Sequence, residues 1–86
     1  MAELIHLVPT VVSHHGRVWA VEVWGERRTD GRWEGWLVFV PVDATRPLAT
    51  ERETTQGTRD ALAYWATGLE PIYLEGALDR ALRRAA

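Results

Sequence analysis

The sequence predicts an α+β domain in which a three-stranded antiparallel sheet, or a four-stranded one, is followed by two helices. Three observations predict this class. A continuous apolar segment, Trp36–Val40, follows a turn signal at Asp30–Gly31. An alternating apolar segment precedes that turn, and helical spacing of apolar residues begins only after Gly57. The predicted order is β-β-β-α-α within a single domain that spans residues 1–86.

The composition is that of an ordinary folded domain, with 47% hydrophobic and 26% charged residues and a net charge of −2. This charge provides no general attraction for nucleic acid or for an anionic membrane. The chain has no cysteine, which excludes disulfides and zinc–thiolate sites. No secretory signal is seen, and no apolar stretch approaches the roughly 20 residues that span a bilayer. We therefore expect a cytoplasmic protein without a membrane or nucleic-acid partner.

The strands are expected in the N-terminal half. Met1–Val8 suits either an edge strand or an ordered arm, and Ser13–Gly16 has the composition of a turn. Arg17–Arg28 alternates as a strand does. Its partner across the Asp-Gly turn begins at Trp33 and ends at Pro41. We expect these two strands to form the central hairpin.

A two-residue loop at Asp30 and Gly31 determines the register predicted for this hairpin. The facing pairs are then Arg28–Trp33, Arg27–Glu34, Gly25–Trp36, Val23–Val38 and Val21–Val40. One register thus yields an ion pair, a tryptophan over a glycine and two valine pairs, and such pairs contribute about 0.2–1 kcal/mol each.

Tryptophan is unusually frequent, with five in 86 residues. In the predicted register Trp19 and Trp36 share one face of the sheet, and Trp24 and Trp33 share the other. Trp65 lies on the apolar stripe of the first helix. A thin domain does not easily hide tryptophans on both faces, and aromatic residues are enriched in interfaces. We therefore expect a homo-oligomer interface on the face of the second pair.

A third strand and a first helix follow the hairpin. Pro47–Arg52 is short and polar and suits an edge strand after a loop at 43–47. One of the polar residues in Thr54–Thr58 caps a helix that runs to about Thr67. Gly68 fits a left-handed C-terminal cap. We expect this helix to cover one face of the sheet.

A second helix begins at Pro71, because proline is well tolerated in a first helical turn. Its apolar stripe consists of Leu74, Leu78, Ala81, Leu82 and Ala85. Asp79 and Arg83 are spaced for a favourable ion pair. Gly76 costs about 1 kcal/mol relative to alanine, and we expect the close approach of another backbone to compensate. This helix, or a second subunit, should cover the other face of the sheet.

The densest polar cluster is Glu51–Gln56. It is either a recognition loop at a helix N-terminus or a charged edge strand that ends in a cap. We include it in the predicted interface, whose residues are Trp24, Trp33, Glu51, Arg52, Glu53 and Gln56.

Patterns for catalysis or metal binding are weak. A metal site would have to combine His14 or His15 with Glu3 or His6, yet adjacent histidines on a strand point to opposite faces. There is no G-x-S-x-G motif and no phosphate-binding glycine loop. The basic end at Arg80–Arg84 is either a phosphate patch or a set of cations at the negative end of a helix. We expect no catalytic residue, metal or cofactor.

Between Trp19 and Leu82 the chain resembles a group of short bacterial proteins of unknown function, in the strings W-E-G-W-L-V-F-V-P, T-E-R-E-T-T-Q and A-L-A-Y-W-A-T-G-L-E-P-I-Y-L-E-G-A-L. The strand order also resembles the HicB-like antitoxin domain, in which a hairpin strand ends at proline and a threonine caps a helix. The matching positions here are Pro41, Thr54 or Thr55, Ala61 and Leu62. The glycine that this family carries soon after the proline is missing.

The sequence therefore favours a non-enzymatic binding or oligomerisation module, acting as a homo-oligomer or with a protein partner. Two alternatives stay open. The chain is an antitoxin-like partner of a small toxin, as the second resemblance implies, or it is a small metal-dependent hydrolase.

Overall fold

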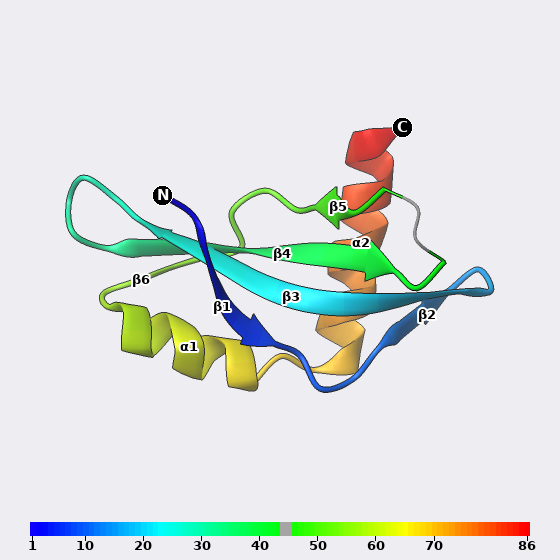
Figure 1. Cartoon of the computed structure of the whole chain (residues 1–86), viewed down its shortest axis with the longest axis horizontal. Helices are drawn as coiled ribbons and strands as arrows, with labels where there is room; N and C mark the ends of the chain where they lie inside the picture. Colours follow the sequence, from blue (N-terminus) through cyan, green and yellow to red (C-terminus); the bar gives the residue numbers. More distant parts are fainter. Residues whose placement is uncertain (44–45) are drawn as a thin grey trace.

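The computed structural model describes residues 1–43 and 46–86, and its architecture is the predicted α+β class (Figure 1). All strands precede both helices along the chain. The strands are β1 (Glu3–Leu7), β2 (Val12–His14), β3 (Arg17–Arg27), β4 (Trp33–Pro41), β5 (Leu48–Ala49) and β6 (Thr54–Gln56), and the helices are α1 (Arg59–Thr67) and α2 (Pro71–Ala85). The loop predicted at 43–47 lies partly outside the described residues.

The sheet is antiparallel and is built around the hairpin of β3 and β4. Strands β1 and β2 pair with the other edge of β3, while β5 and β6 pair with the other edge of β4. The N-terminal segment is thus a strand and not an arm. Two strands were not predicted. Strand β2 overlaps the turn expected at Ser13–Gly16, and β6 lies in the threonine-rich segment that was expected only to cap a helix.

The hairpin register differs by one residue from the predicted register. The backbone N–H of Arg28 donates to the carbonyl of Arg32 at 2.7 Å, and the N–H of Gly31 donates to the carbonyl of Arg28 at 3.0 Å. The loop therefore has three residues, with Gly31 in the left-handed region at φ +87°. The pairs are Arg27–Trp33, Glu26–Glu34, Gly25–Gly35, Trp24–Trp36, Val23–Leu37 and Val21–Phe39. The predicted pairs, among them the ion pair and the tryptophan over a glycine, are wrong.

The observed register changes which side chains share a face of the sheet. The inward side chains of the hairpin include Trp19, Val21, Val23, Leu37 and Phe39, all of them buried. Trp24 and Trp36 face outward together. The predicted grouping of Trp19 with Trp36, and of Trp24 with Trp33, is therefore wrong, because a shift of one residue moves every side chain of a strand to the opposite face.

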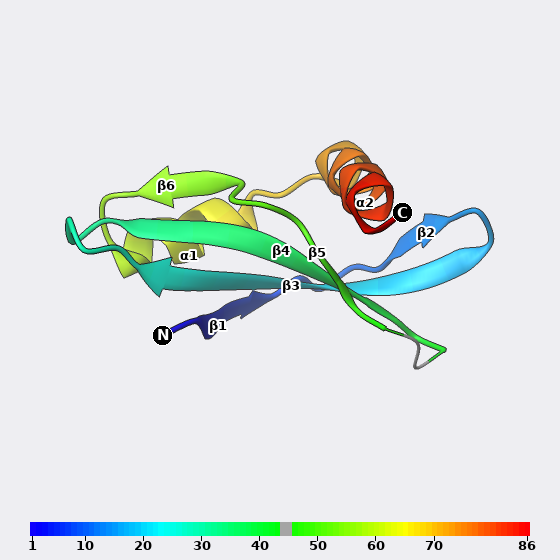
Figure 2. The same cartoon turned by 90° about the horizontal axis from the view of Figure 1, so that it is seen from above.

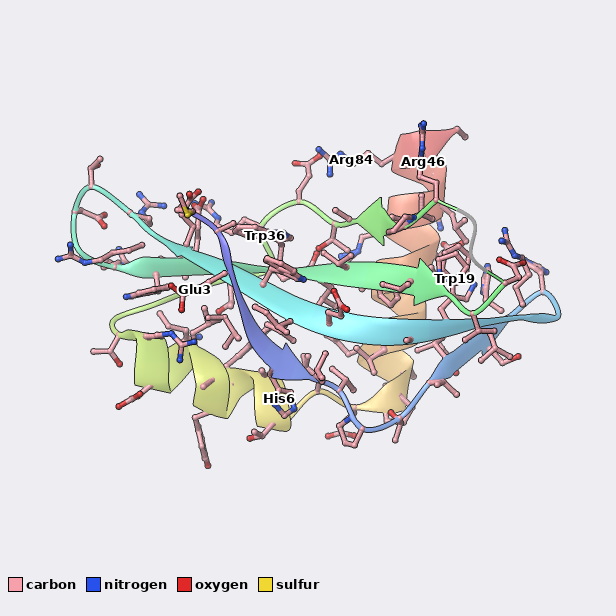
Figure 3. All side chains as sticks on the ribbon, in the orientation of Figure 1. Glu3, His6, Trp19, Trp36, Arg46 and Arg84 are labelled. Atoms are coloured by element: carbon pink, nitrogen blue, oxygen red, sulfur yellow. The ribbon has the colours of Figure 1, made fainter. Side chains whose placement is uncertain are left out.

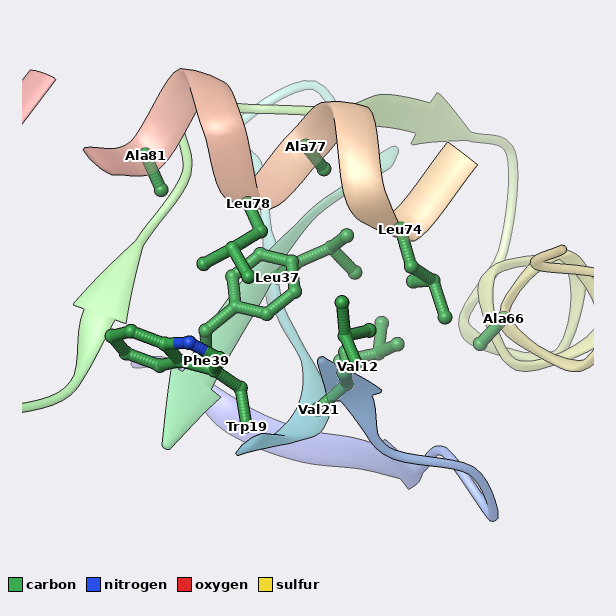
Figure 4. Packing of buried hydrophobic residues seen from close by; sticks show 11 residues of the cluster. Val12, Trp19, Val21, Leu37, Phe39, Ala66, Leu74, Ala77, Leu78 and Ala81 are labelled. Carbon is green, nitrogen blue, oxygen red and sulfur yellow. The ribbon is translucent and has the colours of Figure 1, made fainter. Parts of the chain in front are cut away.

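Both helices pack on the inward face (Figure 2). Helix α1 contacts β1, β4 and β6, while α2 contacts β2 and β5. In Figure 4 the buried side chains of α2 point toward the sheet, with Leu78 beside Leu37 and Phe39 of β4 and Leu74 on the side of Ala66 in α1. We expected the second helix or a second subunit on the other face, and the helix alternative is wrong.

A pair of glycines determines how α1 meets the hairpin. Gly25 and Gly35 lie directly opposite each other. A Cβ atom built on either residue would lie only 2.5 Å from a methyl carbon of Leu62, which is completely buried. The two glycines thus leave the space that this α1 side chain fills, as strand glycines often do where another element approaches closely.

The helix ends agree only in part with the predictions. Thr58 is the N-cap of α1, and its hydroxyl accepts a hydrogen bond from the N–H of Ala61 at 3.0 Å. Gly68 has φ −97°, so the left-handed cap predicted there is wrong. Among the described residues, no atom beyond its own helical turn lies within 4 Å of a Cβ built at Gly76. The backbone approach predicted at this glycine is therefore also wrong.

Candidate functional site: the open face of the sheet

The candidate site is the side of the sheet that points away from both helices, which we call the open face. Its side chains are Leu4 and Leu7 of β1, Val18, Ala20, Glu22, Trp24 and Glu26 of β3, Glu34, Trp36, Val38 and Val40 of β4, and Ala49 of β5. Figure 3 shows Trp36 standing on this side of the hairpin. Most of the set is apolar, although α1 and α2 both lie on the opposite side of the sheet.

Two tryptophans stand near the centre of the open face. Trp24 and Trp36 are direct partners in the hairpin, and both are only partly buried. The indole N–H of Trp24 donates to the carboxylate of Glu22 at 2.9 Å. The indole N–H of Trp24 thus has an acceptor within the chain, so the remaining surface of the ring is apolar and available for contact. Paired aromatic side chains of this kind are typical of the central residues of interfaces.

Charge is distributed unevenly over the open face. Glu26 and Glu34 pair with each other next to the β3–β4 loop, whereas Glu22 pairs with Val38 on the far side of the tryptophan pair. Glu26 pairs with the N-terminal amino group at 2.9 Å, and Glu34 lies 3.8 Å from the guanidinium of Arg28. The end of the open face beyond Glu22 and Val38 is aliphatic and consists of Val18, Ala20 and Val40. The open face thus has an acidic end next to the loop and an aliphatic end, with the tryptophan pair and Glu22 between them.

The structure separates the two tryptophans that were predicted to form one interface. Trp24 lies on the open face, whereas Trp33 lies on the inward side, where its β6 partner is Gln56. The sheet stands between them, so they do not belong to one surface. Trp36 takes the place that the prediction gave to Trp33.

Glu53 connects the segment between β5 and β6 to α2 through hydrogen bonds. Its side chain is only 7% exposed, and its carboxylate accepts hydrogen bonds from the Tyr73 hydroxyl and from the Arg80 guanidinium, the latter at 2.8 Å. Burial of the phenol, its hydrogen bond to Glu53 and the charge of that carboxylate raise the pKa of Tyr73 to about 12. The phenol is therefore protonated at neutral pH and donates to the carboxylate. Glu53 thus has a structural contact and is not free to bind a partner.

The other polar residues of the predicted interface are more exposed. Glu51 lies 3.8 Å from Arg84, and both line a cleft of about 260 Å³ together with Arg52. The side-chain amide of Gln56 donates to the hydroxyl of Thr54 at 2.7 Å, within β6. The predicted cluster is therefore divided between a small cleft beside α2 and the β6 edge.

The arginines at the C-terminal end have partners within the chain. Arg83 pairs with Asp79, as predicted from their spacing. Arg80 pairs with Glu53, and Arg84 donates to a carbonyl of β5 at 3.3 Å. A phosphate bound here would have to compete with the carboxylates that already pair with all three of these guanidinium groups.

The histidines come from different places in the fold. His6 lies in β1, while His14 and His15 lie at the turn between β2 and β3, with ring centroids 4.2 Å apart. Within residues 1–43 and 46–86, no three His, Cys, Asp or Glu side chains are grouped to hold a metal ion. No described helix is both long and apolar enough to cross a membrane.

No family model matches the chain, and searches of the curated proteins and of the solved structures give no significant match. These comparisons therefore give no support to the two family resemblances noted from the sequence. What the chain does is therefore inferred from the open face itself.

Trp36 is the site residue that sequence reasoning placed on the wrong face of the sheet, and the length of the hairpin loop determines which face it takes. A glycine at the third loop position suits a three-residue loop. The Asp30 carboxylate accepts a hydrogen bond from the N–H of Arg32 at 3.0 Å. That bond lowers the pKa of Asp30 against an opposing effect of desolvation, and the neighbouring charge of Arg28 lowers it further. Asp30 therefore stabilises the longer loop and, through it, the register that turns Trp36 outward.

Proposed function

We propose that this chain is a non-enzymatic binding module that assembles as a homodimer through its open face. The supporting observation is the placement of both helices on one side of the sheet, which leaves the Trp24–Trp36 pair near the centre of the uncovered side. Contiguous apolar surface with a charged margin marks sites of protein association.

The open face has the size of a small stable interface. The β3–β4 hairpin contributes nine residue pairs. With about 3.3 Å per residue and about 4.8 Å between strands, four strands cover an area of about 30 by 19 Å, or about 570 Å². Specific interfaces begin at about 600 Å² per partner. The whole open face is therefore needed for a stable contact, and the tryptophans at its centre have to carry much of the binding energy.

The distribution of charge favours one relative orientation of the two copies. Packed sheets lie about 10 Å apart, with strand directions within about 30° of each other. When the strands of the two copies run in opposite directions and the two-fold axis crosses the middle of the hairpin, Glu26 and Glu34 of each copy lie over Ala20 and Val40 of the other. The parallel orientation would stack Glu22, Glu26 and Glu34 on their own counterparts, and repulsion disfavours it. The antiparallel orientation also brings the two tryptophan pairs together near the two-fold axis.

Sedimentation equilibrium of Trp36→Ala and Trp24→Ala tests this proposal. A central interface residue contributes about 2 kcal/mol or more, and each substitution acts on both copies of a symmetric dimer. We therefore expect the dimer dissociation constant to rise at least about a hundredfold. Circular dichroism at the same concentrations verifies that each variant is folded.

Trp33→Ala is the matched control, because it removes the same side chain from the same strand but on the helix side of the sheet. We expect it to lower stability without changing the dimer constant. A wild-type chain that stays monomeric at millimolar concentration would refute the proposal. Equal loss of assembly in Trp33→Ala and Trp36→Ala would also refute it, since the effect would then not depend on the open face.

A basic partner protein is the second candidate occupant of the open face. The carboxylates of Glu22, Glu26 and Glu34 favour it, because an acidic surface attracts a basic one. In this version the chain acts as the antitoxin-like partner of a small toxin. It requires a reading frame for a small basic protein beside the gene, and coexpression of the two proteins should give a complex that Trp36→Ala weakens. Absence of such a reading frame would remove this candidate.

A further inference from the structure

A second surface lies where α1 ends and α2 begins. A cleft of about 760 Å³ is lined there by Tyr64, Trp65, Thr67, Gly68, Leu69, Glu70, Ile72 and Tyr73. All of these residues belong to the two helices or to the short connection between them. Both helices pack on the inward face of the sheet (Figure 2), so the cleft that their residues line is separate from the open face.

Aromatic side chains form the walls of this cleft. The rings of Trp65 and Tyr73 are nearly perpendicular, with their centroids 6.3 Å apart. Tyr64 and Ile72 also line the cleft, and they are 82% and 80% exposed. Side chains exposed to this extent contribute little to the core, so folding does not explain why they gather here.

The cleft carries negative charge without a matching cation. The last turn of α1 contains no basic residue, so no cationic side chain there offsets the partial negative charge of its C-terminus. Glu70 lines the cleft, and no ion pair involves its carboxylate within the described part of the chain. Arg80 lies 6.0 Å from the Tyr73 ring, but it is already paired with Glu53. A carboxylate and a helix C-terminus beside aromatic rings form a surface that attracts a cation.

The geometry points to this cleft as a binding site for an arginine side chain of a partner peptide. The guanidinium would stack on the Tyr64 or Trp65 ring and donate to the Glu70 carboxylate. Arginine fits better than lysine, because its planar group stacks on aromatic rings and pairs with a carboxylate through two parallel hydrogen bonds. A cleft of about 760 Å³ is within the range of ligand pockets. It therefore has room for the residues that flank the arginine.

Titration of the ¹⁵N-labelled protein with acetyl-Gly-Gly-Arg-Gly-Gly-amide, followed by NMR, tests the site. The matched probe is the same peptide with citrulline, which keeps the shape of arginine but lacks its charge. We expect saturable shifts of the Trp65 indole and of backbone amides between residues 64 and 73, with a Kd of about 1 mM or lower. The citrulline peptide should produce no saturable shift.

Two substitutions test which side chains of the cleft bind the peptide. Tyr64→Ala and Glu70→Gln should each raise the Kd about threefold or more, through loss of the ring or of the carboxylate charge. Glu75→Gln is the matched control, because Glu75 is an exposed carboxylate on the same helix that does not line the cleft. This control should leave the Kd unchanged, and added salt should weaken binding to the wild-type chain.

Any one of three results would overturn the inference. The first is a citrulline peptide that binds as tightly as the arginine peptide, and the second is a lysine peptide that binds more tightly than the arginine peptide. The third is a Glu75→Gln variant that weakens binding as much as Glu70→Gln does. The outcome is independent of the homodimer. Trp36→Ala changes the mass of the assembly and leaves peptide binding intact, whereas Tyr64→Ala has the opposite effects.

Discussion

Replacement of Gly35 by alanine tests how α1 is seated on the hairpin. The added Cβ would lie 2.5 Å from a Cδ atom of Leu62, whereas carbon atoms in contact are about 3.5–4.0 Å apart. Leu62 is 0% exposed, so its methyl group has no solvent into which it could move. Overpacking of this kind costs about 1–3 kcal/mol. Alanine offsets about 0.4–1 kcal/mol of this cost, because it is less flexible than glycine in the unfolded chain.

We therefore expect Gly35→Ala to lower the free energy of unfolding by about 1 kcal/mol or more, and the melting temperature by about 4–8 °C for each kcal/mol. Urea unfolding monitored by tryptophan fluorescence gives the value. The protein concentration has to be the same for all variants, because dimerisation couples stability to concentration. Gly76→Ala is the control. Its site is open and helical, so the same substitution should raise stability by about 0.5–1 kcal/mol.

A double-mutant cycle then identifies the contact. Leu62→Ala alone should cost about 2–5 kcal/mol, because it empties a buried site. With Gly35→Ala in the same chain, the new methyl group occupies part of that space. The double variant should therefore lose at least about 1 kcal/mol less than the sum of the single losses. Additive losses within about 0.5 kcal/mol, or a Gly35→Ala variant as stable as the wild type, would refute the close contact with Leu62.

Three hydrogen bonds give further predictions. Thr58→Ala should lower the free energy of unfolding by about 1 kcal/mol through loss of the α1 cap, and Thr58→Ser should restore it. Thr50→Val should cost about 1–3 kcal/mol, because the N–H of Leu37, which donates to the buried Thr50 hydroxyl at 3.0 Å, would lose its acceptor. Urea unfolding measures both variants. The pKa of Tyr73 is about 12 in the folded chain and 10.0 as the ordinary value. Its stabilising contribution is therefore complete below pH 10 and is lost as the pH rises toward about 12. Glu53→Gln should lower this pKa in an absorbance titration, and an unchanged titration would show that the carboxylate has no effect on the phenol.

The hairpin was predictable from the sequence, but its register was not. Asp30 and Gly31 suit a two-residue loop and also the end of a three-residue loop. Both registers pair apolar side chains with each other, so the pairs alone do not decide between them. The difference lies in Gly25 and Gly35, which meet only in the observed register and there make room for Leu62. That contact joins the hairpin to a helix that begins far along the chain, and strand periodicity contains no information about it.

The residues of the candidate site were likewise predictable only in part. The alternation of β3 correctly separates Trp24 from Trp19 within that strand, because such alternation is independent of register. The faces of β4 depend on the register, and Trp36 and Trp33 were therefore exchanged. Strand β6 was missed because its threonines also suit a helix cap. What makes this segment a strand is its pairing with β4, where the N–H of Glu53 begins the contact by donating to the carbonyl of Gly35 at 2.8 Å.

The short connection between the helices explains why α2 does not cover the open face. Helix α1 ends at Thr67 and α2 begins at Pro71, so three residues connect them. Three extended residues reach about 10 Å. A sheet with helices on both faces places the helices on opposite sides of that sheet, about 20 Å apart, because each packed layer is separated from the next by about 10 Å. The connection is therefore too short for α2 to reach the other face around the edge of the sheet. The length of this segment in the sequence alone would have excluded α2 from that face. A second molecule can consequently dock against Trp24 and Trp36 without displacing any element of the fold.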